Sequence, residues 1–196
     1  FTFSQVSSDK ATVKLSWAKT SVSFEVKVDK AKLVNENIKQ QLNSLPWWGW
    51  TGLFNAARYN LNNNVYLDDA ITWINRSIQN NRNYSNLNLK ASILEKQGKS
   101  GSGNKLKAEA LKIATVRDLQ RAAFAKFRAK DFKGGLNILK NTLKNSPNNY
   151  QSYTSMAWGY TQAKDSKSAK KMYKKALKMA PQDRKEAIQK AMDKLK

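Results

Sequence analysis

At 196 residues the chain is long enough for one compact domain or a short array of repeated units. The absence of cysteine excludes disulfides and thiolate metal sites, and the absence of histidine excludes the commonest general base and imidazole ligand. The net charge is +22, and residues 99–196 hold 24 basic and 7 acidic side chains, against 12 and 7 in residues 1–98. Such a field attracts nucleic acid, anionic lipid, acidic glycans or acidic proteins.

Residues 1–28 have the pattern of a small antiparallel β-sheet. Polar and apolar residues alternate over 12–17 and again over 22–28, which predicts a hairpin, and residues 1–3 suit a third strand. A sheet of this size is marginally stable alone. We therefore expect it to pack on the helices or to be the remnant of a larger β domain. Because the chain begins at Phe1 without a signal-peptide pattern, we expect a mature or truncated product.

Residues 29–50 form a predicted linking region. Leu33, Val34, Ile38 and Leu42 recur at helical spacing, and Pro46 predicts the end of that helix. The Trp47-Trp48-Gly49-Trp50 segment that follows is interpreted as a packing plug between sheet and helices, or as an exposed aromatic platform.

Residues 51–181 contain an internal repeat. Small and large apolar residues recur at one fixed separation, as expected where two helices approach closely and a proline ends the second. The third repeat has Leu119, Ala122, Ala123, Lys126, Gly135, Leu139, Thr142 and Pro147; the fourth has, in the same order, Tyr153, Met156, Ala157, Tyr160, Ala169, Tyr173, Ala176 and Pro181.

Two weaker copies precede these repeats. The first has Phe54, Ala57, Leu61, Ala70, Ile74 and Ser77; the second has Leu87, Ala91, Leu94, Gly103 and Ala110. The glycine-serine segment 98–103 predicts a mobile turn or hinge between the helices of the second pair. Residues 182–196 predict a helix that caps the open end of the stack.

The spacing and the residues at 153–181 resemble the tetratricopeptide repeat (TPR) family, with alanine at 157 in the usual glycine position and Lys126 where an aromatic is expected. The resemblance implies a mainly α fold: a TPR-like α-solenoid of about four helix pairs, preceded by the small antiparallel sheet. It also implies a groove lined by the first helix of each pair.

A wider resemblance involves the strands at 15–28 and the segments 55–59, 62–65 and 70–77. They are similar to the C-terminal part of an uncharacterised exported bacterial family, in which a β-rich domain of unknown function precedes TPR-like helices. This resemblance implies a cell-envelope location, periplasmic or associated with the outer membrane, with a cytoplasmic one as the alternative.

No catalytic constellation is evident, so we expect a protein that is not an enzyme and needs no metal or cofactor. Asp68-Asp69 precedes a predicted helix and is interpreted as a capping pair that favours the positive end of the helix dipole. The segment Gly101-Ser102-Gly103 lacks the strand that a phosphate loop requires before it.

The candidate partner-binding residues follow from the groove orientation that the TPR resemblance implies. Exposed arginines beside aromatics suit a carboxylate, a phosphate or an acidic peptide; alternatively, the arginines only solubilise the helix and the aromatics pack internally. The groove candidates are Asn55, Tyr59, Asn62, Asn88, Ser92, Arg117, Arg121, Phe124, Arg128, Trp158 and Gln162.

A lysine stripe lies on the predicted helix opposite Ala169, Tyr173 and Ala176. It is either a solvated face or a docking surface for a polyanion. Its members are Lys167, Lys170, Lys171, Lys174, Lys175 and Lys178.

The leading functional hypothesis is a non-catalytic interaction scaffold whose groove holds an acidic or extended segment of a protein partner, as a subunit of a cell-envelope assembly. The alternative is a basic surface that binds nucleic acid, anionic lipid or acidic glycan. Nucleic acid is the less favoured partner because no motif that reads DNA or RNA is present.

Overall fold

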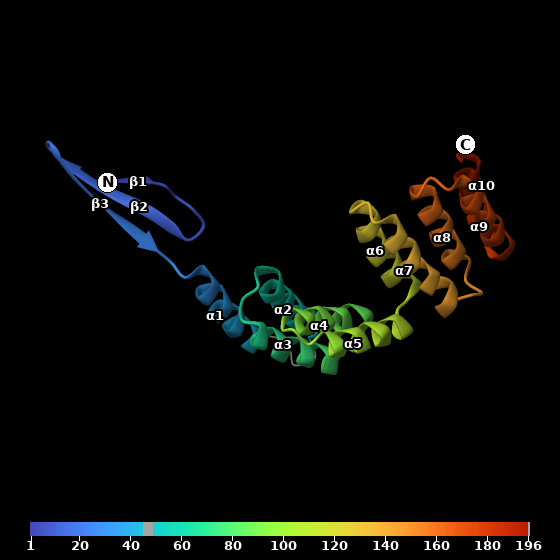
Figure 1. The fold of residues 1–196 in the computed structure, drawn as a ribbon, viewed down its shortest axis with the longest axis horizontal. Coiled ribbons are helices and arrows are strands. Elements are labelled where there is room, and N and C mark those ends of the chain that lie inside the picture. The colour runs from blue at the N-terminus through green and yellow to red at the C-terminus, as the bar shows by residue number, and fades with distance from the viewer. Residues whose placement is uncertain (45–48, 196) are drawn as a thin grey trace. The chain divides into compact units, whose positions relative to one another are not determined.

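The computed structural model describes residues 1–44 and 49–195, and it divides into two compact units, Phe1–Asn81 and Arg82–Lys196. Figure 1 shows the order of the elements along the chain. The strands are β1 (Thr2–Ser4), β2 (Lys10–Trp17) and β3 (Thr20–Lys27). The helices of the first unit are α1 (Lys30–Asn43), α2 (Thr51–Asn63) and α3 (Leu67–Asn80). Those of the second unit are α4 (Tyr84–Lys96), α5 (Ser100–Ile113), α6 (Val116–Arg128), α7 (Phe132–Asn145), α8 (Tyr150–Gln162), α9 (Ser166–Met179) and α10 (Gln182–Asp193).

The predicted sheet forms, with β2 between β1 and β3 in an antiparallel arrangement. Its register places Phe3 and Phe24 on either side of Val13, and Leu15 opposite Val22, so one face is largely apolar. Only Val13 on that face is buried, while Phe24 is 50% exposed. Among the described residues, no strand packs extensively on a helix. Of the two alternatives, packing on the helices is therefore not seen, and the remnant of a larger β domain stays a prediction.

The three helices of the first unit are tied together by a buried chain of polar side chains. Asn60 on α2 is fully buried and donates from Nδ2 to Asn35 Oδ1 at 3.0 Å. Asn35 on α1 in turn donates to Asp69 Oδ2 on α3 at 2.7 Å. Lys39 pairs with the same carboxylate oxygen at 2.8 Å. Since buried polar groups are costly unless they are paired, this network fixes how α1 packs on α2 and α3.

The four helix pairs share one backbone signature. Between the two helices of each pair, a residue that follows the first helix adopts the left-handed conformation: Asn64 (φ 55°), Gly98 (φ 80°), Lys130 (φ 59°) and Lys164 (φ 61°). The first pair has a second such residue, Tyr66 (φ 45°). The four residues that follow the first helices end those helices and let the chain reverse direction. Their nearly even spacing along the chain confirms the predicted repeat from the backbone itself.

Small side chains recur at the positions where paired helices approach each other. The first helices carry fully buried alanines, and the second helices carry a buried alanine or glycine. These residues are Ala57, Ala91, Ala123 and Ala157 in the first helices and Ala70, Gly103, Gly135 and Ala169 in the second. The helix pairs therefore form a TPR-like fold, as the residue pattern predicts.

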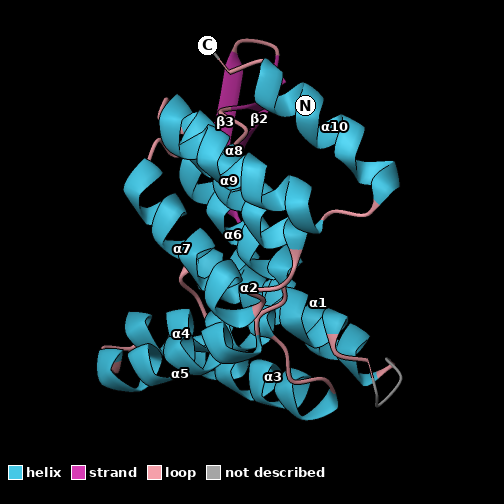
Figure 2. Ribbon diagram, turned by 90° about the vertical axis from the view of Figure 1, so that its right-hand side faces the viewer, coloured by secondary structure: helices cyan, strands magenta, loops and turns pink. Residues whose placement is uncertain are grey.

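Helix α10 closes the second unit against α9. Ile188 is 6% exposed and lies in a cluster with Tyr173, Ala176 and Ala180. Figure 2 shows the chain from a second direction, with α10 and the other helices in cyan. The predicted cap at 182–196 forms over Gln182–Asp193. Whether the pair α2–α3 continues the same array as α4–α9 stays a prediction.

Two sequence-based predictions are wrong in detail. The 98–103 segment is not a loop, because Ser100 begins α5 and only Gln97, Gly98 and Lys99 lie between α4 and α5. Asp68 and Asp69 lie in the first turn of α3, where the helix dipole favours them, but no side chain caps that helix. Asp69 instead bonds to α1, since its carboxylate lies within reach of two donors there.

Of the tryptophan-rich junction, Gly49 and Trp50 are described, whereas Trp47 and Trp48 lie outside the described residues. Trp50 packs edge-on against Phe54 with ring centroids 6.0 Å apart. Its carbonyl accepts a hydrogen bond from Ser77 Oγ at 3.0 Å. Trp50 thus packs against helices of the first unit, and a plug between the sheet and the helices stays a prediction.

Candidate binding groove

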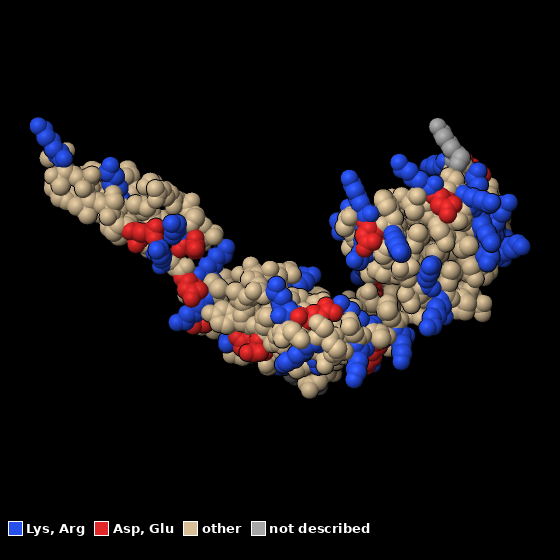
Figure 3. Space-filling view, viewed as in Figure 1, with Lys and Arg blue, Asp and Glu red and all other residues tan. Residues whose placement is uncertain are grey.

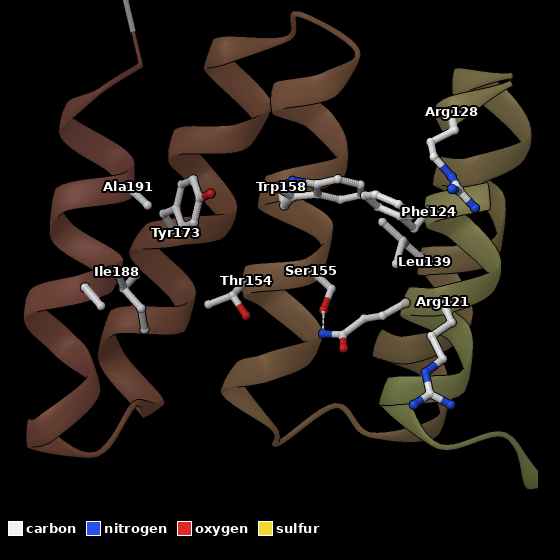
Figure 4. A pocket seen from close by; sticks show the side chains of 12 residues that line it. Arg121, Phe124, Arg128, Leu139, Thr154, Ser155, Trp158, Tyr173, Ile188 and Ala191 are labelled. Atoms are coloured by element: carbon white, nitrogen blue, oxygen red, sulfur yellow. Dashed lines mark hydrogen bonds between the residues drawn. The ribbon is translucent and has the colours of Figure 1, made fainter. Parts of the chain in front are cut away.

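The second unit contains a cavity of about 780 Å³. Its walls are the first helices of the last two pairs together with the capping helix, and Figure 4 shows the side chains that face it. Helix α6 contributes Gln120, Arg121, Phe124 and Arg128; α8 contributes Thr154, Ser155 and Trp158; α10 contributes Ala187, Ile188 and Ala191; and Leu139 and Tyr173 form the back. We call this cavity the α6–α8–α10 groove.

One wall of the groove is a row of flat side chains. Phe124 and Trp158 stack with centroids 5.8 Å apart and an angle of 24° between their planes. The Arg128 guanidinium carbon lies 5.0 Å from the Phe124 ring centroid. Phe127 supports the indole edge-on from the core at 5.0 Å. The row is therefore held from behind, although Phe124 itself is 48% exposed.

Close packing around Phe127 depends on two glycines. A Cβ at Gly135 would lie 2.7 Å from the Phe127 ring, and one at Gly159 would lie 2.7 Å from Leu139 Cδ1. Contacts this short force a neighbour to move. The absence of side chains at these two positions therefore sets where the aromatic wall stands.

The floor of the groove is polar. Gln120 Nε2 donates to Ser155 Oγ, which itself donates to the Gln151 carbonyl one turn earlier on α8. Thr154 Oγ1 donates to the same carbonyl at 3.1 Å. These groups leave the Gln120 carbonyl free to accept and the hydroxyls able to accept, so the floor can bond to an extended backbone.

The opposite wall is apolar and comes from α9 and α10. Ile188 and Tyr173 are buried, and Ala187 and Ala191 extend the surface along α10. Burial raises the pKa of the Tyr173 phenol above its ordinary value, so this side chain is neutral around pH 7.

The groove is positively charged. Its charged lining residues in the described part of the chain are Arg121 and Arg128, and neither forms an ion pair there. An arginine that forms no ion pair has donors available to a carboxylate or phosphate.

The structure brings together Arg121, Phe124, Arg128 and Trp158 among the predicted groove residues. Arg117 and Gln162 are exposed on the same two helices but lie outside the lining. Sequence reasoning missed Gln120 and Thr154, although each precedes a predicted groove aromatic by four residues and so shares its helix face. It also missed α10 as a wall, because that helix was interpreted only as a cap.

The remaining groove candidates belong to other helices. Asn55 and Tyr59 line a separate hollow of about 420 Å³ between α1 and α2. Asn62 is exposed and lies outside that lining. Asn88 Nδ2 donates to the Tyr84 carbonyl at 2.8 Å within α4, and Ser92 is half-buried on the same helix. None of these five lines the α6–α8–α10 groove.

The lysine stripe lies outside the groove. All six lysines from Lys167 to Lys178 are exposed along α9. In Figure 3 the blue side chains gather along the edge at which Figure 1 places α9.

Across residues 1–44 and 49–195 no group of three or more acidic side chains gathers in a way that could hold a metal ion. Nor does any helix in that part of the chain combine the length and the apolar character of a membrane span.

No family model and no curated protein matches the chain. Similar solved structures include YrrB, a TPR protein with an unusual peptide-binding site, at 11% identity and a TM-score of 0.39, over 79% of this chain and 80% of YrrB. MamA shares 14% identity with a TM-score of 0.40, over 76% and 88% of the two chains. The C-terminal part of a TPR repeat-containing protein from Cytophaga hutchinsonii shares 13% with a TM-score of 0.40, over 84% and 72%. The chain's own helix pairs, with their repeated turns and buried small residues, define the TPR-like fold.

Proposed function

We propose that this chain is a non-catalytic interaction scaffold whose α6–α8–α10 groove binds an extended, acidic segment of a partner protein. The observation that supports this most directly is the combination of two arginines without ion pairs and a stacked aromatic pair on one wall of a single cavity in the described part of the chain.

The arginines favour a carboxylate. Arg121 and Arg128 lie on the same face of α6, two turns from each other. Because no acidic side chain among the described residues lines the groove, an incoming carboxylate meets no repulsion from its walls. Hydrogen bonds between guanidinium and carboxylate are roughly twice as strong as neutral ones and are often bidentate.

The rest of the groove favours an extended peptide over a small acid. Gln120 and Thr154 line the same cavity as the aromatic wall and the apolar wall around Ile188. A peptide in extended form presents backbone amides to such a polar floor while successive side chains point to alternate sides. One side chain can then meet the aromatics and the next the aliphatic wall.

The test begins with peptides selected on the immobilised protein from a random display library. A selected peptide is titrated by calorimetry against the wild type, Arg121→Ala and Arg117→Ala. Loss of a charge-assisted bond of roughly 1.5–3 kcal/mol predicts about 10- to 100-fold weaker binding for Arg121→Ala. Arg117→Ala is the matched control, because it removes the same charge from the same helix outside the groove.

Two further results bear on the proposal. Trp158→Ala is expected to weaken binding at least tenfold by removing half of the stacked pair. Changing the peptide's acidic residues to their amides is expected to abolish the difference between wild type and Arg121→Ala. Equal affinities of the Arg121→Ala and Arg117→Ala variants would show that the peptide binds elsewhere and would overturn the groove assignment.

A cell-envelope location is also part of the proposal and is supported by sequence resemblance alone. Fractionation of source cells with an antibody against this chain tests it. Recovery only in the cytoplasmic fraction would contradict it and leave the groove proposal standing.

A further inference from the structure

The outward side of α9 is uniformly basic. Six of its fourteen residues are lysines, each of them exposed, and the helix contains no acidic residue. Its inward side holds Ala169, Tyr173 and Ala176, all buried. Apart from Lys175, whose ammonium group lies 5.8 Å from the Tyr153 ring, the lysines of this described helix contact no partner that would hold them in place.

The preceding outward helix repeats this arrangement. Helix α7 also has no acidic residue, and it exposes Lys133, Lys140 and Lys144. Each of these has a lysine at the equivalent position of the next repeat: Lys167, Lys174 and Lys178. Since equivalent positions in successive repeats face the same side of a stack, the two rows lie on one surface of the second unit.

The acidic residues that precede these two helices are already engaged. Asp131 and Asp165 precede α7 and α9, and each accepts a hydrogen bond from a backbone N–H in the first turn, at 2.8 Å from Gly134 and 3.0 Å from Ser168. In the described part of the chain, none of the nine lysines of α7 and α9 forms an ion pair. The surface therefore presents its full positive charge to solvent.

We propose that this α7–α9 lysine surface docks the protein onto the anionic headgroups of a phospholipid bilayer. Charge complementarity selects an anionic partner, with each lysine near such a surface contributing about fivefold in binding. The residue types favour lipid over nucleic acid. The rows contain only lysines, which are point charges, and no arginine that would fork onto phosphates. The exposed aromatic of these two helices, Phe132 at the start of α7, packs against Phe127 with ring centroids 6.2 Å apart, so it offers no free ring for stacking on bases.

The experiment is co-sedimentation of the full chain with vesicles of phosphatidylcholine containing about 30 mol% phosphatidylglycerol, with pure phosphatidylcholine vesicles alongside. We expect binding to the anionic vesicles only, weakening steeply as the salt concentration rises from about 0.1 to about 0.5 M. Replacing Lys170, Lys174 and Lys178 with glutamine is expected to lower the partition coefficient roughly 10- to 100-fold.

The matched control replaces Lys14, Lys30 and Lys32 with glutamine as well. These lysines are exposed in the first unit, and the change removes the same total charge. It is expected to bind within about threefold of the wild type, since the charges lie off the proposed surface. Far-UV circular dichroism establishes that both triple variants remain folded.

Three outcomes would overturn the proposal. In the first, the two triple variants bind anionic vesicles equally weakly, so that only net charge matters. In the second, the wild type sediments with neither kind of vesicle or with both alike. In the third, a DNA duplex is bound more tightly and with greater resistance to salt than the vesicles, which would assign the surface to nucleic acid.

Discussion

Two glycines in the first turn of α5 provide a sensitive test of the fold, because they have the same chemistry and different surroundings. A Cβ added at Gly101 meets nothing within 4 Å. A Cβ added at Gly103 would lie 2.9 Å from the Ala91 carbonyl oxygen and 2.9 Å from Glu95 Cγ. The Ala91 carbonyl oxygen belongs to the backbone of α4, so it cannot rotate away as a side chain can.

The expected effects on stability have opposite signs. Gly101→Ala reduces the conformational freedom of the unfolded chain and is expected to stabilise the protein by about 0.5 kcal/mol. Gly103→Ala gains the same amount but forces α4 and α5 apart, at a cost of about 1–3 kcal/mol. We therefore expect Gly103→Ala to be less stable than Gly101→Ala by about 1–3 kcal/mol.

The measurement is equilibrium unfolding in urea followed by far-UV circular dichroism, with hydrogen exchange of peptides from α4 and α5 as the local readout. Exchange is expected to accelerate in both helices of Gly103→Ala and to slow or stay unchanged in Gly101→Ala. If the two variants unfold at the same urea concentration, the close approach of α4 and α5 is absent, and 98–103 is the mobile loop that its composition suggests.

Two further predictions concern the edges of the two units. Burial alone would raise the pKa of Asp69, but hydrogen bonds from Lys39 and Asn35 outweigh it and lower that pKa. The stability this carboxylate provides is thus present above its unfolded pKa of about 4 and is lost as the pH falls through its folded value. In urea unfolding between pH 7 and acidic pH, the free energy of unfolding of Asp69→Asn is expected to fall less steeply with falling pH than that of the wild type. The same pH dependence in both proteins would contradict this role. Ile188→Ala is expected to cost about 2–4 kcal/mol locally and to speed hydrogen exchange in α10 while α4 and α5 are unaffected; unchanged protection of α10 would refute its role as a cap.

Most of the secondary structure was predictable because two periodicities are plain in the residues. Alternation over 12–17 and 22–28 predicts strands, and β2 and β3 form there. Buried alanines such as Ala123 and Ala157 recur at one repeat length, because helices of a pair must approach closely at the same point in every repeat.

Predictions from local composition were wrong where tertiary packing outweighs local preference. Ser100 to Gly103 has the composition of a linker, yet α5 begins there because a glycine at 103 is what the contact with α4 requires. Asp69 was interpreted from its own helix, whereas its partners Asn35 and Lys39 lie on α1, with the whole of α2 between them in the chain. A pattern of neighbouring residues cannot predict partners that are so distant in the sequence.

The sequence by itself determined the helix pairs, the sheet and the excess of basic charge, since each follows from residue types at fixed spacings. The groove was decided only by tertiary structure. Arg117 and Arg121 occupy equivalent places in the helical pattern, but only Arg121 lines the cavity. Whether a side chain faces a cavity depends on where neighbouring helices end and cross, and those angles are set by packing between α6, α8 and α10, not by the period of any one helix.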